Sequence, residues 1–512
     1  MSLVPFLLVT IGGTVVALFV RSSTRLVALV GSIVLVGALV TSLLIRPDEV
    51  LVIGDSGLAT TAYLRLFLVL GSVVGLLLAF VGAAAGSRRD VPAVTAAILG
   101  TSALALALPD PRAAVLAATA GGLFGSVLAI ASIGARGGAT VGTRVLRTTV
   151  IAGTMAVAAA AWIGRDLSEL AAQPIVFGLA YLAMAVAVAI RFGAIPFHAW
   201  AARLTEAIPE TTLPVVTAIG PAAFAVVALA WTDASITPLL VDLGSVRAVV
   251  LAIAVASILL ASVAAWIQDD IEHIVGYAIV GDAGVVLLAV AALAPEAWAP
   301  ARTWILAFIV TRSAFAAWAA AIRTQFFTGR VGDLRGWAIR SPLLAATLGL
   351  VVVAGIGLPG LAAFEARASI VGLALNGGLA TAVFLGTLSP LVYYGRLVVV
   401  GVDRPDGPPG PRMWRPALPP LDLTDLRGWA GRAWAADRGF AAAAGALALA
   451  VLALAVSVGA FGGPAAAAGG APSLDAAIES FAPDGPTGPG EAEPSPGTSP
   501  LGGPSFEAVP TS

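Results

Sequence analysis

The feature that most constrains this chain is a series of apolar stretches that recurs along almost its whole length. A helix needs about 20 mainly apolar residues to cross a bilayer, because the hydrocarbon core is about 30 Å thick and each residue adds about 1.5 Å. The sequence predicts about fourteen such helices. Their approximate ranges are 3–20, 25–45, 65–86, 92–108, 113–134, 146–163, 175–195, 213–231, 248–267, 274–294, 302–322, 342–362, 369–400 and 439–461.

The composition agrees with a membrane protein and excludes a soluble enzyme of this size. Only 11% of the 512 residues are charged, whereas a soluble domain carries roughly 25%. The apolar stretches lack the alternation with period two that membrane barrels show. We therefore predict an all-α polytopic membrane protein, since each helix satisfies its own backbone hydrogen bonds.

Several kinds of site are excluded by the residue types that the chain lacks. Net charge is −1, which gives no basic face for nucleic acid. There is no cysteine, and the histidines are His198 and His273, too far apart for a convincing metal site. We predict no metal, no cofactor and no catalytic site in this chain.

The distribution of basic residues predicts the orientation in the membrane. All 28 basic residues are arginine, and they gather in the connections that follow odd-numbered helices. Positively charged connections stay in the cytoplasm. We therefore predict a multi-pass protein of the cell (inner) membrane with both termini on the extracytoplasmic side.

Composition and helix order divide the chain into parts. Residues 421–434 are predicted to form a helix on the cytoplasmic membrane surface, and the last part, rich in Gly, Pro and Ser, is expected to be disordered. The parts are 1–91 (helices 1–3), 92–231 (a first five-helix repeat, helices 4–8), 247–400 (a second five-helix repeat, helices 9–13), 402–436 (a Pro- and Arg-rich cytoplasmic connection), 439–461 (the last helix) and 462–512 (the tail).

Helices 7 and 12 are predicted to be interrupted, at Pro196 and Pro359 respectively. Proline removes a backbone donor and clashes with the preceding turn. Each interrupted helix is the fourth of its five-helix unit, and because five is odd the two units would have opposite orientations. Interrupted helices at matching positions point to an ion site in a transporter. The alternative is two unrelated proline kinks.

Charged residues inside the predicted helices are the candidate functional residues. Charges within hydrocarbon are expensive and normally face a polar interior. Together they predict a proton path, although each one alone fits a helix-to-helix hydrogen bond equally well. His198, near a helix end, is either a proton relay or a plain interfacial histidine. The charged candidates are Arg191, Asp282, Arg312, Glu365 and Arg367.

Four motifs resemble one known family, the antiporter-like subunits of respiratory complex I and the Mrp cation/proton antiporters. The first, Arg-Phe-Gly-Ala-Ile-Pro-Phe-His-Ala-Trp, resembles the family's segment-7 signature, in which a lysine precedes proline, histidine and tryptophan. The others resemble the entry to segment 10, the connection before segment 12, and segment 12 itself. In order, the motifs occupy residues 191–200, 268–277, 332–342 and 358–367.

The resemblance implies a fold and a function. The fold would be two inverted five-helix repeats, and the function would be that of a membrane subunit in a complex I-like (NADH:quinone oxidoreductase type) assembly. Such a subunit takes part in redox-coupled proton translocation, with the redox cofactors held in partner subunits and with other membrane subunits and the bilayer as its surroundings. By position, Arg191, Arg312 and Arg367 stand at lysines of segments 7, 11 and 12.

The chain also departs from the family pattern. Segment 5, around residues 128–134, lacks the family's glutamate, and residues 214–231 of segment 8 contain neither lysine nor histidine. Arginine, unlike lysine, does not release its proton in proteins. Two alternatives therefore stay open: a conduction-deficient structural subunit with the same fold, and an Mrp-like cation/proton antiporter or inorganic-carbon uptake subunit.

Overall fold

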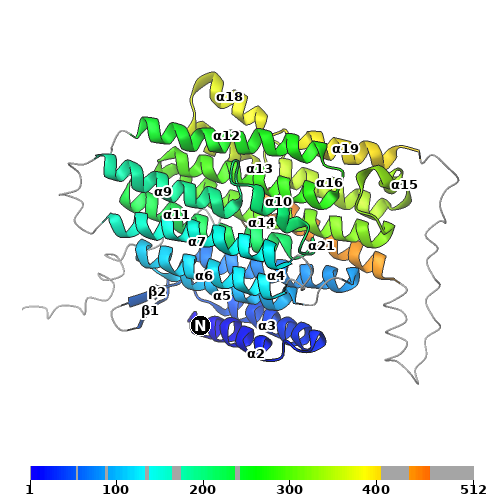
Figure 1. Ribbon diagram of the computed structural model, residues 1–512, viewed down its shortest axis with the longest axis horizontal. Coiled ribbons are helices and arrows are strands. Elements are labelled where there is room, and N and C mark those ends of the chain that lie inside the picture. The colour runs from blue at the N-terminus through cyan, green and yellow to red at the C-terminus, as the bar shows by residue number, and fades with distance from the viewer. Residues whose placement is uncertain are drawn as a thin grey trace, which may run out of the picture.

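The computed structural model describes residues 2–53, 56–86, 90–132, 138–163, 174–236, 243–404 and 437–461. In this part of the chain almost every segment is helical, and the helices lie side by side, with α2 and α3 on one side of the bundle and α12 and α19 on the other (Figure 1). The predicted surface helix at 421–434 and the tail at 462–512 lie outside the described residues.

Eleven helical segments among the described residues are long and apolar enough to cross a membrane. Their apolar side chains follow the stretches that the sequence predicts. The helices that form these segments are α3 (Thr24–Leu44), α4 (Ala62–Ala85), α6 (Pro111–Ser132), α7 (Gly138–Trp162), α9 (Pro174–Phe192), η2 with α11 (Val215–Ile219 and Gly220–Ser235), α12 (Gly244–Ile267), α13 (Ile271–Ala292), η4 with α14 (Pro295–Ala297 and Trp298–Phe326), α18 with α19 (Gly377–Gly386 and Pro390–Val402) and α21 (Arg438–Val458).

Shorter apolar helices lie at the other predicted spans, so the count of fourteen stays a prediction. The first of them is a run of three consecutive short elements near the start of the chain, and the other short elements follow a helix break or lie in a connection. The shorter apolar helices are α1–η1–α2 (Val4–Leu7, Leu8–Gly12 and Gly13–Phe19), α5 (Val91–Ala107) and α16 (Pro342–Ile356), and the other elements are α10 (Ala199–Thr205), η5 (Val331–Leu334), α15 (Trp337–Arg340) and α17 (Ala362–Ala374).

A small hairpin corrects the all-helical prediction. Strands β1 (Val50–Ile53) and β2 (Ser56–Ala59) pair antiparallel, with Val50 opposite Ala59. The run Val-Leu-Val-Ile followed by Gly-Asp is a hairpin signal, because branched residues favour strands and Gly and Asp favour tight turns. Hydropathy does not reveal these strands, because they are short and lie in a connection between apolar helices.

The predicted breaks in helices 7 and 12 are present. Helix α9 ends at Phe192, the next residue, Gly193, has φ of 65°, and α10 begins at Ala199. Helix α16 ends before Gly357, where φ is 67°, and α17 begins five residues later. Both glycines adopt the left-handed region that other residues avoid. Each break thus contains a glycine in the left-handed conformation, which turns the chain, and a proline, which cannot continue a helix because it lacks the backbone N–H.

The predicted boundaries of helices 12 and 13 were wrong. Helix 12 continues past its break through α17, and no single helix covers 369–400 within the described residues. The chain turns at Gly377, where φ is 60°, and α18 and α19 are separated by residues 387–389. Pro390 begins α19 because proline suits the first turn of a helix but not its interior. Hydropathy alone predicts one helix over 369–400, but an Asn-Gly-Gly turn and a Ser-Pro pair divide this stretch among α17, α18 and α19.

Helix α14 forms the centre of the bundle. Its apolar window is entirely buried, and α4, α13, α16, α17 and α21 pack around it. Helix α21, coloured orange in Figure 1, packs against α4, α14 and α16, although it comes last in the described chain. A side chain at Gly445 of α21 would meet Val81 of α4 at 2.7 Å, so only glycine permits this close packing.

The outermost helices present apolar side chains to their surroundings. On α3, Leu29 is 59% exposed and Ile33 is 63% exposed, and α12 exposes leucine and valine in the same way. Apolar surface on this scale is unfavourable in water but suits contact with lipid. The interior, in contrast, holds four of the charged candidates, Arg191, Asp282, Arg312 and Arg367.

Candidate functional site: a buried polar cluster

The centre of the site is an ion pair between α14 and α13. The Nε of Arg312 lies 2.5 Å from Oδ2 of Asp282, and the side chains are 1% and 9% exposed. Burial of both groups strengthens the attraction between opposite charges. A pair of this kind is stable only when its remaining donors also find partners.

Two tyrosines of α19 supply those partners. Nη1 of Arg312 donates to the hydroxyl of Tyr394 at 3.0 Å and, more weakly, to that of Tyr393 at 3.4 Å. Both rings are buried, and their centroids lie 4.5 Å apart. The consecutive helices α13 and α14 and the more distant α19 therefore meet at one guanidinium.

Arg367 of α17 lies at the break between α16 and α17. Its Nη2 donates to the carbonyl of Ile356, the last residue of α16, and its side chain is among the largest fully buried ones. The guanidinium carbon lies 5.7 Å from the rings of Trp304 and Phe364 and 5.8 Å from that of Phe384. Aromatic faces attract a cation, so these rings help to hold the charge beside the helix break.

Arg367 and Asp282 line the same small cavity, together with Ser262 of α12 and Thr387. The structure thus brings three predicted residues, Arg312, Asp282 and Arg367, to one place. The cavity provides space between the carboxylate and the second arginine. A hydroxyl-lined space beside a carboxylate suits one or more water molecules.

Arg191 lies elsewhere, at the end of α9. It is 8% exposed, and its Nη1 donates to the Thr149 hydroxyl at 2.8 Å; that hydroxyl lies 3.0 Å from Oγ of Ser126 on α6. Gly122 of α6 is the next neighbour, since a Cβ there would lie 2.9 Å from Nη2. No described carboxylate contacts this guanidinium. The surroundings of this guanidinium on α6 and α7 are thus a hydroxyl and a glycine, without a carboxylate among the described residues.

The two other charged or polar candidates are not part of the buried cluster. Glu365 is exposed, and its Oε1 accepts a hydrogen bond from the backbone N–H of Gly360 at 3.3 Å, which ties the break to the start of α17. His198 is half-buried, and its ring centroid lies 6.1 Å from that of Tyr277. The helix-break residues Pro196 and Pro359 are exposed.

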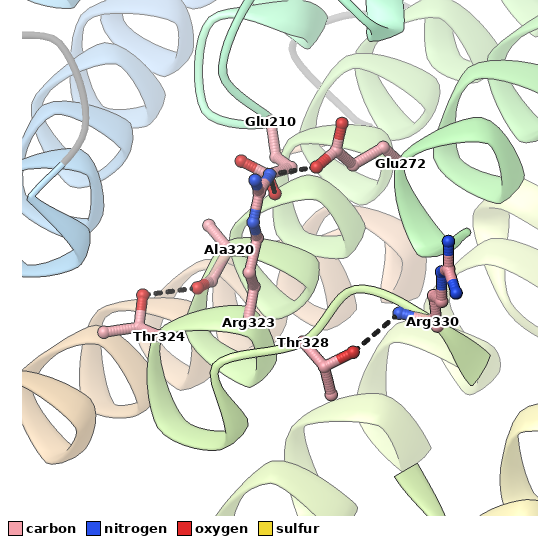
Figure 2. A network of polar contacts seen from close by, with 7 residues as sticks. All are labelled: Glu210, Glu272, Ala320, Arg323, Thr324, Thr328 and Arg330. Atoms are coloured by element: carbon pink, nitrogen blue, oxygen red, sulfur yellow. Dashed lines mark hydrogen bonds and ion pairs between the residues drawn. The ribbon is translucent and has the colours of Figure 1, made fainter. Parts of the chain in front are cut away.

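A second charged group, which the sequence analysis did not single out, lies where α13 begins and α14 ends. Figure 2 shows Arg323 reaching toward Glu210 and Glu272. Nη1 of Arg323 lies 2.9 Å from Oε1 of Glu210 and also contacts Oε1 of Glu272. Nearby, Nε2 of His273 lies 3.7 Å from Oε1 of Glu206. Glu210 is buried although it lies in a connection. In the sequence, its burial is indicated only by the neighbouring Pro, Thr and Leu residues.

The comparisons with known proteins agree with the resemblance seen in the motifs. Residues 147–392 match the family described as NADH:quinone oxidoreductase/Mrp antiporter, TM. NADH-quinone oxidoreductase subunit N of Halorhodospira halophila is 29% identical over 238 residues, which are 45% of this chain and 48% of that protein. The chain therefore matches about half the length of this curated relative. The predicted resemblance to the antiporter-like membrane subunits is confirmed.

Two solved structures share the fold over nearly the whole chain. They are chains of the Mrp complex from Dietzia sp. DQ12-45-1b and of respiratory complex I from Thermus thermophilus, each with a TM-score of 0.66 and 20% identity. Each covers 91% of this chain, which in turn covers 97% and 100% of the two chains. Both are chains of complexes, and the fold is that of a multi-pass membrane protein.

Proposed function

We propose that this chain, which resembles the antiporter-like membrane subunits, serves as such a subunit in a complex I-like assembly and takes part in redox-coupled proton translocation. The similarity to a subunit N and the fold shared with a complex I chain support this assignment. The observation that carries it is the buried ion pair of Arg312 and Asp282, which lies with Arg367 beside a broken helix.

The chemistry divides the roles within this cluster. Arginine keeps its proton in proteins, so Arg312 and Arg367 act as fixed positive charges. Asp282 carries the carboxylate, which is able to accept and release a proton. A proton that arrives on Asp282 weakens its attachment to Arg312. The cavity shared by Asp282 and Arg367 then provides the space into which the proton leaves.

The same proposal includes the finer architecture. The breaks between α9 and α10 and between α16 and α17 support two inverted five-helix repeats at 92–231 and 247–400. The arginine-rich connections support the orientation with both termini on the extracytoplasmic side. In this arrangement other membrane subunits of the assembly flank the bundle, and the redox cofactors belong to partner subunits.

Proton pumping by the assembled complex in vesicles tests the proposal. We expect Asp282→Asn and Arg312→Ala to abolish most pumping while electron transfer stays measurable, because the first removes the buried carboxylate and the second its partner. Arg340→Ala is the matched control, since Arg340 is exposed at the end of α15. Fully assembled complexes in which both interior variants pump normally would overturn the proposal.

The surroundings of Arg191 favour a second candidate, a structural subunit that does not conduct. This arginine donates to the hydroxyl of Thr149 and faces Gly122, no described carboxylate pairs with it, and it cannot itself release a proton. If the subunit is purely structural, loss of the chain should lower the yield of the assembled complex. Substitutions at Asp282, Arg312 and Arg191 should then also leave the number of protons pumped per electron unchanged.

A further inference from the structure

A cavity lies beside Arg191, between α5, α6, α9 and α11. It is small, with about 20 Å³ open to the centre of a water-sized sphere, and part of it is open to the outside. Nη2 of Arg191 faces Gly122 of α6 and Gly220 of α11 there, and Thr101, Ser102 and Ser126 also line the cavity. The cavity is separate from the one that Asp282 and Arg367 share.

The buried charges of the described chain do not balance. Four arginines are buried, at 191, 302, 312 and 367, against two buried carboxylates, Glu210 and Asp282. Asp282 pairs with Arg312, and Glu210 pairs with the half-exposed Arg323. Within the described residues, the polar contact of Arg191 is its hydrogen bond to Thr149. A neutral hydroxyl satisfies a donor, but it does not neutralise a charge.

An uncompensated guanidinium at this depth is unfavourable. A buried cation is normally paired, because removal of a charge from water is not repaid by neutral dipoles alone. A lysine could relieve the cost by losing its proton, but arginine cannot. The charge of Arg191 therefore calls for a counter-ion that the described side chains do not supply.

We propose that the cavity beside Arg191 binds a small monovalent inorganic anion, such as chloride. The anion would lie against Nη2 of Arg191 and near Ser102. The rest of the lining is apolar, including Ile98 and Phe224, which favours a weakly hydrated anion over sulfate or phosphate. One negative charge matches one guanidinium.

Gly122 provides the room for this anion. A Cβ built at Gly122 would lie 2.9 Å from Nη2 and 3.1 Å from the guanidinium carbon of Arg191. An acidic side chain at this position would therefore reach the guanidinium and occupy the same space. The anion thus takes the place that a carboxylate on α6 would fill.

The direct test measures chloride binding by the full chain purified in detergent. We expect saturable retention of one radioactive chloride per chain, and a higher melting temperature in chloride than in gluconate at equal ionic strength, because a ligand that binds the folded state stabilises it. Arg191→Gln removes the positive charge and is expected to weaken chloride binding by about tenfold or more.

A second variant keeps the test decisive if Arg191→Gln fails to fold. Gly122→Asp supplies the counter-charge from the protein itself, and the flexible end of Arg191 can shift to admit it. We expect this variant to fold, to lose chloride binding and to melt at the same temperature in chloride and gluconate. The matched control is Arg247→Gln, which removes an arginine bound to the carbonyls of Ala291 and Ala374 and should retain the response to chloride.

Two results would overturn the anion site. One is a wild-type chain that retains no chloride and melts equally in chloride and gluconate. The other is a chloride response that persists unchanged in both Gly122→Asp and Arg191→Gln. Neither result bears on proton pumping through Asp282 and Arg312, which is measured separately in the assembled complex.

Discussion

Arg312 and Asp282 join α14 to α13 by an ion pair of 2.5 Å in the interior of the bundle. The residues are 30 positions apart in the sequence and belong to neighbouring helices that pack along their length. Because the pair lies on the most buried helix of the structure, its integrity affects both the packing of the core and the proposed proton path.

Neutralisation of Asp282 should destabilise the protein strongly. Asp282→Asn leaves Arg312 without its counter-charge, and removal of one partner from a buried pair costs about 3–5 kcal/mol. The double variant Asp282→Leu/Arg312→Met should recover a large part of this loss, because no isolated charge is left. Thermal unfolding of the purified full chain measures both. Strictly additive effects would show that the two groups are not coupled.

The two tyrosines that accept hydrogen bonds from Arg312 should contribute unequally to the stability of the folded protein. Tyr394 accepts at 3.0 Å and Tyr393 at 3.4 Å. A hydrogen bond to a charged group contributes about 1.5–3 kcal/mol. We expect Tyr394→Phe to lose stability in this range and Tyr393→Phe to lose clearly less. Equal losses in a side-by-side melting experiment would contradict the difference in geometry.

The packing of α13 on α12 should depend on a single glycine. A Cβ at Gly284 would lie 2.7 Å from the carbonyl oxygen of Ala254, whereas one at Gly281 would meet Ala261 at an ordinary 3.7 Å. Gly284→Ala must push two backbones apart and should cost about 1–3 kcal/mol. Gly281→Ala, one turn earlier on the same helix, should be neutral or stabilising by up to about 1 kcal/mol. The reverse order of melting temperatures would refute this packing.

The charged group in Figure 2 predicts that one substitution restores part of the stability that another removes. Arg323→Gln leaves Glu210 and Glu272 side by side without their shared cation, and like charges repel. Because Arg323 is 53% exposed, solvent screening limits the loss to about 1 kcal/mol. Removal of one negative charge by adding Glu272→Gln should restore part of the stability. A double variant that is less stable than Arg323→Gln would argue against this repulsion.

The sequence was a good guide to the helices and to the charged candidates. Arg312 and Asp282 were visible because a charge stands out within an apolar stretch, but their pairing depends on how α13 and α14 pack. Tyr393 and Tyr394 gave no signal, since tyrosines near a helix end are typical of the membrane interface. Hydropathy also joined α18 and α19, because a turn of three residues hardly changes an average over twenty.

The neighbours of Arg191 show a different limit of sequence reasoning. The sequence shows that segment 5 lacks a glutamate, but it does not show which residues of α6 face the arginine. The structure places Gly122 and Ser126 there, earlier in the helix than the stretch in which the carboxylate was sought. Glycine and serine are common in membrane helices for packing reasons alone. The sequence therefore does not identify Gly122 and Ser126 as residues near the arginine.

The position of α21 has a consequence for biosynthesis. This helix packs against α4, α14 and α16, yet it follows a connection of more than thirty residues and is made after all of them. The packing around the central helix α14 can therefore be completed only after that connection has been translated.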